Sequence, residues 1–103
     1  MSEFCLNLMV SGGEISSDIS RLTADSVDYV TAQFTFDESW NGLYKTAVFR
    51  LGENVYHTVL ENDKCSVPHE VLSDGMIYIS VFGVSGTTRA TTKEVSVYIE
   101  KSG

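Results

Sequence analysis

The chain has 103 residues, of which 43% are hydrophobic and 20% charged, with a formal net charge of -7. This length suits one domain with one core, residues 1–103, and the balance of hydrophobic to charged residues excludes wholesale disorder. Seven basic against 14 acidic residues argue against nucleic acid as a partner. The apolar runs are too short to span a bilayer and no secretory segment is visible, so we expect no membrane partner.

The first predicted strand covers residues 4–10, where apolar and polar residues alternate before the turn at residues 11–13. The returning segment, residues 14–22, has Ile15, Ile19 and Leu22 among serines and an aspartate. That spacing would suit a helix. The serines, the aspartate and the lack of good helix formers instead favour an exposed edge strand that closes a hairpin.

The run at residues 34–50 is the predicted centre of the fold, two strands joined by a tight corner that carries the only tryptophan. Residues 27–36 form the first of these strands, with its core face made by Val30, Ala32, Phe34 and Phe36. A second strand over 44–51, a turn at 52–54 and a returning strand over 55–60 follow the corner. The sequence therefore predicts that the chain packs around this corner.

The last third of the chain predicts three more strands. Residues 64–67 form a short one that Pro68 ends, and residues 68–72 form a single helical turn with proline in its first position. The nearly continuous apolar run at 76–84 predicts a central strand covered on both faces. A polar, flexible linker at 85–92 leads to a final strand with alternating apolar residues.

Seven or eight short strands and one helical turn near 68–72 predict an all-β domain, an antiparallel β-sandwich or a small barrel. No pattern predicts a catalytic, cofactor or metal site, so we expect a protein that is not an enzyme. His57 is expected on the solvent face of a strand and His69 beside the helical turn. Cys5 and Cys65 fit no zinc site, and we expect both to be buried and reduced.

Aromatic residues are the candidates for an interaction surface, with Trp40, Tyr44 and Tyr56 as its members. A tryptophan in a β-domain loop either plugs the core or offers a stacking platform for sugars and partner proteins. The tight corner and the nearby Leu43 favour the plug. The sequence leaves open where on the domain an aromatic surface would lie.

Three parts of the chain carry a family resemblance. They are residues 29–50, with the signature Phe34-Thr-Phe-Asp-Glu-Ser-Trp-Asn-Gly-Leu-Tyr-Lys-Thr-Ala-Val-Phe49, residues 65–72, and the late segments 83–86 and 89–92. In these parts the chain resembles small virion-associated β-sandwich proteins of tailed bacteriophages and prophages of Gram-positive gut bacteria. Members of that group are described as head-fibre, tail-fibre and baseplate proteins. The resemblance spans most of the chain.

The resemblance implies a non-enzymatic virion structural protein of the tail fibre, baseplate or capsid surface, made in the host bacterial cytoplasm. Such a protein would act through contacts with other virion proteins, in symmetric copies. The matching residues look structural, so the resemblance transfers no site. Two alternatives stay open: a glycan-binding module that recognises the host surface by stacking Trp40 and exposed tyrosines on sugars, and a prophage-encoded inhibitor of a bacterial defence protein that mimics nucleic acid.

Overall fold

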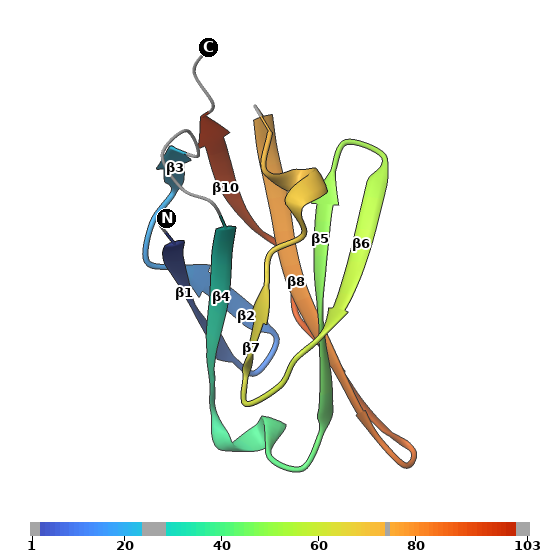
Figure 1. Ribbon diagram of the computed structural model, residues 1–103. Helices are drawn as coiled ribbons and strands as arrows, with labels where there is room; N and C mark the ends of the chain where they lie inside the picture. Colours follow the sequence, from blue (N-terminus) through green and yellow to red (C-terminus); the bar gives the residue numbers. More distant parts are fainter. Residues whose placement is uncertain (1–2, 24–28, 74, 101–103) are drawn as a thin grey trace.

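The computed structural model describes residues 3–23, 29–73 and 75–100, which form two facing sheets (Figure 1). The four-stranded sheet has the order β2 (Glu14–Ser17), β1 (Glu3–Ser11), β4 (Tyr29–Phe36) and β7 (Lys64–Ser66). The six-stranded sheet has the order β3 (Arg21–Thr23), β10 (Val95–Glu100), β8 (Gly75–Ser85), β5 (Tyr44–Leu51) and β6 (Asn54–Val59), with β9 (Thr88–Thr91) beside β8. The predicted β-sandwich is confirmed, and the small barrel is not formed.

The sheets are mixed, where the sequence predicted antiparallel pairing. β1 pairs with β4 in parallel and β3 pairs with β10 in parallel, while the other strand pairs are antiparallel. The described residues form ten strands in place of the predicted seven or eight, partly because the predicted edge strand at 14–22 is two edge strands. Between them the Asp18 carboxylate accepts bonds from the backbone and side chain of Asn7, at 3.2 and 3.1 Å. These bonds hold the point at which the chain leaves one sheet for the other.

The core lies between the sheets and is built from the inward residues of every long strand. Its fully buried members include Leu6, Leu8, Val30, Phe34, Trp40, Phe49, Ile77, Ile79, Val81, Val97 and Ile99. The face of β4 that the sequence predicted to be inward is confirmed, with Phe36 half-buried at its end. Residues 27 and 28 of that predicted strand lie outside the described residues.

Trp40 is the plug that closes one end of the core. The corner folds as a short 3-10 helix, η1 (Glu38–Trp40), and the indole is 1% exposed. Its Nε1 donates to the Gly12 carbonyl at 2.9 Å, and its ring lies 5.3 Å from that of Phe36. A Cβ at Gly83 would come within 3.1 Å of the indole, so glycine lets the tryptophan pack against the β8 backbone.

The predicted linker at 85–92 is wrong, because β8 and β9 form a hairpin there. The threonines of this segment are β-branched residues that suit a strand as well as a loop. At its end Thr92 is buried, and its Oγ1 accepts from the Val81 N–H at 3.0 Å and donates to the Lys93 carbonyl at 2.7 Å. The Thr92 hydroxyl thus takes the place of a backbone carbonyl as the acceptor for the Val81 N–H, just beyond the end of the β8–β9 pairing.

Two smaller predictions have different outcomes. The helical turn near 68–72 is confirmed as the 3-10 helix η2 (His69–Val71), which Pro68 precedes. The burial predicted for Cys5 is wrong, since Cys5 points outward from β1 while its neighbours Phe4 and Leu6 point inward. Cys65 is half-buried, and both thiols are free as predicted.

Candidate protein-binding face

The three aromatic residues that the sequence offered for an interaction surface do not share one. Trp40 is buried, so it is removed from that set. Tyr56 is half-buried and packs against the core from β6, opposite Phe49. Tyr44 alone is open to solvent, with 79% of its surface exposed. Of the three, Tyr44 is therefore the one that a partner could contact, and it lies on the outer face of the six-stranded sheet.

That outer face gathers most of the exposed apolar side chains of the described residues. The most exposed large hydrophobic residues are Met9, Tyr44, Val55, Val59, Met76 and Val84. All except Met9 belong to β5, β6 or β8 and occupy the outward positions that alternate with buried ones. Tyr44 lies directly opposite Val84 in the register. An apolar strip therefore runs along the outside of this sheet.

Half-buried aromatic rings on the same face carry arginines above them. The guanidinium carbon of Arg50 lies 4.3 Å from the centre of the Tyr78 ring. Arg21 lies 5.3 Å from the Tyr98 ring. A third pair joins Arg89 to Phe82, also at 5.3 Å. We call these three pairs, together with the exposed Tyr44, Val55, Val59, Met76 and Val84, the aromatic face.

The ring of Phe82 has a second neighbour, because His57 of β6 meets it edge-on at 6.0 Å. With His57, the aromatic face extends over all six strands of this sheet, from β3 at one edge to β6 at the other. Cation–π stacking and edge contacts hold these side chains in place on an otherwise uncovered sheet. The prediction that the apolar run at 76–84 is covered on both faces is wrong, because the opposite sheet covers the inward face of β8 and its outward face carries these rings.

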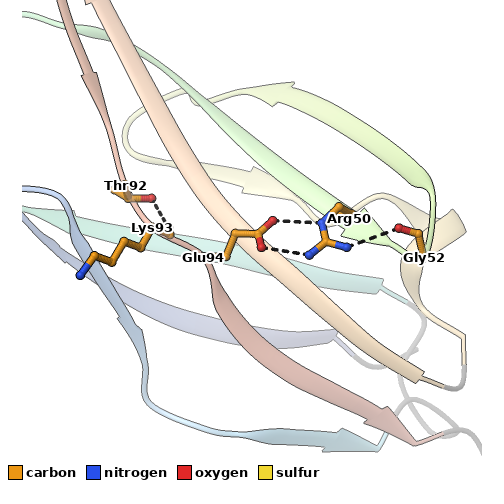
Figure 2. Close-up of polar contacts among 5 residues, drawn as sticks. All are labelled: Arg50, Gly52, Thr92, Lys93 and Glu94. Atoms are coloured by element: carbon orange, nitrogen blue, oxygen red, sulfur yellow. Dashed lines mark hydrogen bonds and ion pairs between the residues drawn. The ribbon is translucent and has the colours of Figure 1, made fainter.

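Arg50 is the most firmly held of the arginines (Figure 2). Its Nε and Nη2 donate to the two carboxylate oxygens of Glu94 at 3.0 and 2.9 Å, and its Nη1 donates to the Gly52 carbonyl at 3.4 Å. The hydrogen bond from Arg50 lowers the pKa of Glu94, and the same bond raises the pKa of Arg50. This pair ties β5 to the segment before β10 across the outside of β8.

The outer face of the four-stranded sheet has a different chemistry. Apart from the exposed Met9, the outward residues described on β1 and β4 are small or polar, among them Cys5, Asn7, Thr31, Gln33 and Thr35. Tyrosine, methionine and arginine are enriched where proteins bind one another, and small polar residues are not. The aromatic face is therefore the broad surface with the composition of a protein-binding site.

Two shallow depressions lie near the end of β6. The larger is lined by Cys5, Thr31, Gln33, Thr58, Val59, Glu61, Asn62, Lys64, Cys65 and Ser66, with no aromatic residue. The smaller is lined by Leu43, Tyr44, Lys45, Val59, Leu60, Asn62 and Asp63. In the smaller one the Lys45 ammonium lies 3.5 Å from the Asp63 carboxylate, and Tyr44 provides the aromatic wall.

The described residues contain no group of three histidine, cysteine or acidic side chains placed to hold a metal ion. In the same part of the chain, no helix has the length and apolar content that crossing a membrane requires. His57 lies on the solvent face of β6 as predicted. What the sequence does not reveal is that Arg50, Tyr78 and Glu94 meet, because they belong to three segments distant along the chain.

No protein-family model matches the chain, and no curated protein matches it. Among solved structures, the chain is similar to the N-terminal domain of ORF48 of phage TP901-1. The similarity covers 98% of this chain and 100% of that one, with a TM-score of 0.53 and 17% sequence identity. At this sequence identity the similarity shows the fold alone: the chain and that N-terminal domain have a similar fold.

Proposed function

We propose that the chain is a non-enzymatic structural module of a tailed-phage virion that attaches to another virion protein through its aromatic face. The observation that carries the proposal is the concentration of exposed apolar and arginine-stacked aromatic side chains on one of the two broad faces. The fold shared with the phage TP901-1 domain and the resemblance of residues 29–50 to virion proteins support the phage setting. The tail fibre, the baseplate and the capsid surface are the locations we propose.

The face is suited to binding because its longest side chains are already ordered. An arginine that stacks on a ring in the free protein loses less conformational freedom when a partner covers it. Arg50 has its carboxylate partner in place before binding, so covering it leaves no unpaired charge. The exposed Tyr44, Val59 and Val84 supply the apolar area that such a contact would remove from water.

The first test is whether the protein is part of the particle. Mass spectrometry of purified virions of the source phage should find the chain in amounts comparable with other minor structural proteins. Its absence from virions would overturn the proposal.

A variant pair then tests the face itself. Val84→Asp places a charge on the aromatic face, and Met9→Asp places the same charge on the outer face of the other sheet. We expect virions carrying Val84→Asp to lose the protein and those carrying Met9→Asp to retain it. Equal incorporation of both variants, with circular dichroism showing both folded, would contradict the role of the aromatic face.

A second candidate is a glycan-binding module, which the smaller depression favours. There the strongly exposed Tyr44 stands beside Asn62 and Asp63, an aromatic wall with amide and carboxylate groups that hydrogen-bond sugar hydroxyls. A glycan array compares the wild type with Tyr44→Ala, and Tyr98→Ala serves as a control away from the depression. Binding that only Tyr44→Ala abolishes supports this candidate, and no binding by the wild type rejects it.

A further inference from the structure

The strand β6 is an open edge with unusual composition. It is the last strand of the six-stranded sheet and lies at the upper right of Figure 1. Its residues 54–59 include no lysine, arginine, aspartate, glutamate or proline. Val55 and Val59 are 49% and 72% exposed, and His57 between them is also exposed. The strand therefore presents a neutral, partly apolar edge to solvent.

The backbone of this edge is available for pairing. Leu51 and Asn54 are partners across the two-residue turn, and the Leu60 N–H donates to the Lys45 carbonyl at 2.9 Å. These contacts set the phase of the antiparallel ladder, in which every second residue of β6 bonds to β5. The N–H and C=O groups of Val55, His57 and Val59 consequently point away from the sheet.

The other edges of the described sheets are shorter and charged. β2 has four residues and contains Glu14, and β3 has three and contains Arg21. β7 has three residues and contains Lys64. β9, with four residues, contains Arg89. Short strands and charged residues are the usual protection of a sheet edge against pairing with another chain, and the six-residue β6 lacks both.

We propose that β6 is a self-association edge that pairs antiparallel with β6 of a second copy, about a two-fold axis at His57. The sequence of the strand is nearly symmetric about that residue, Val55-Tyr-His-Thr-Val59. This register places Val55 of one copy opposite Val59 of the other, and His57 opposite its own copy. An interface of this type must be complementary to itself, and the repeated valines satisfy that condition.

Charge favours β6 over the rest of the surface as the contact between copies. Each chain carries a net charge of -7, so two copies repel wherever acidic residues meet. Asn54–Val59 has no charged side chain, and the nearest carboxylates, Glu53 and Glu61, lie just beyond its ends. In the proposed register Glu53 of one copy approaches Glu61 of the other. Added salt therefore strengthens the association by screening this pair and the net charge.

Pairing through β6 would join two six-stranded sheets edge to edge. Paired residues of neighbouring antiparallel strands point to the same face, so the two aromatic faces would form one continuous surface. The inference does not depend on the role in a virion, because it rests on the edge alone. An interface of one strand pair belongs to the small, transient class, so we expect a weak association.

The first experiment measures self-association of the reduced protein by sedimentation equilibrium over micromolar concentrations. We expect the wild type to show a monomer–dimer equilibrium that tightens with added salt. Val59→Lys and His57→Lys should each weaken it roughly tenfold or more, because each introduces a charge at the paired edge. Met9→Lys, on the other sheet, and the neutral His57→Gln should leave it unchanged. A wild type that stays monomeric at all concentrations overturns the proposal, as does equal weakening by Met9→Lys.

The second experiment tests the register by cross-linking, in a Cys5→Ser background that removes the exposed native thiol. A cysteine introduced by His57→Cys would face its own copy at a Cα separation of about 5.5 Å, within the range for a disulfide. Mild oxidation should convert this variant to a covalent dimer. The variant with Met9→Cys in the same background is the control for random collision. Equal dimer yields from the two variants would overturn the register.

Discussion

Arg50 and Glu94 form a two-point ion pair across the outside of β8. The guanidinium nitrogens Nε and Nη2 lie 3.0 and 2.9 Å from the two carboxylate oxygens, and the same guanidinium covers the ring of Tyr78 at 4.3 Å. Figure 2 shows how this pair links β5 to the segment before β10, and the stacked Tyr78 adds β8 to the contact. Since planar two-point geometry suits arginine and not lysine, the pair also specifies the residue type at position 50.

Glu94→Gln is expected to lower the melting temperature by a few degrees at most at neutral pH, because the pair is partly exposed. The effect depends on pH in a definite direction. The pKa of Glu94 is lowered in the folded protein by its bond to Arg50, so its stabilisation is complete above the unfolded value of 4.5. It is lost as the pH falls through the folded pKa. Melting curves of both proteins should therefore differ at pH 7 and converge well below pH 4.5.

The control for this comparison is Glu53→Gln, a carboxylate in the exposed turn between β5 and β6. It removes the same charge without breaking the pair, so its melting temperature should stay near that of the wild type. A Glu94→Gln curve that matched the Glu53→Gln curve at every pH would show that the ion pair contributes nothing to stability.

Thr92→Val should destabilise the fold by about 1–3 kcal/mol, because it leaves the buried Val81 N–H without its 3.0 Å acceptor. The shapes of the two side chains are nearly the same, so packing is preserved. Thr92→Ser keeps the hydroxyl and should recover most of the loss. Urea denaturation gives the free energies of unfolding, and amide exchange at Val81 should accelerate in the valine variant alone. If the serine variant is the less stable of the two, the methyl group matters more than the hydrogen bond.

The sandwich could be predicted because the patterns that indicate it lie within single strands and turns. Alternation on β1, β4, β5 and β10 identifies the inward residues directly, and turns with glycine or proline separate the strands. The parallel pairing of β1 with β4 could not be predicted in this way, since register between distant strands depends on packing across the core. The hairpin of β8 and β9 was missed because a run of threonines suits both loop and strand.

The candidate site was harder to predict than the fold. Tyr44 could be named from the sequence as a candidate interaction residue. Trp40, named with it, is instead a core residue, because Gly83 leaves space for its ring. The aromatic face depends on arginines from β3, β5 and β9 that reach rings on neighbouring strands. Each arginine alone looks like an ordinary solvated charge. Only the strand order brings them to one side.

Gly83→Ala tests the packing of the tryptophan corner. The added Cβ would lie 3.1 Å from both Leu43 and the Trp40 ring, closer than ordinary contact, so both side chains have to shift slightly. We expect a loss of about 1–3 kcal/mol in the free energy of unfolding, measured in urea, and a change in tryptophan fluorescence. Gly13→Ala is a matched control, because a Cβ there meets only a carbonyl oxygen at 3.5 Å. Equal losses in the two variants would mean that Gly83 is not a close-packing position.

The two cysteines should differ in reactivity by a wide margin. Burial raises the pKa of the Cys65 thiol to about 11, whereas Cys5 is exposed on the outer face of β1. Only the thiolate reacts with iodoacetamide, so at pH 8 very little of Cys65 is in the reactive form. We expect mass spectrometry of the native protein to find one fast modification in the wild type and in Cys65→Ser, and none on the same timescale in Cys5→Ser. Unfolding in urea should make Cys65 react as well, and fast labelling of Cys65 in the folded protein would contradict its half-buried position on β7, packed against the core.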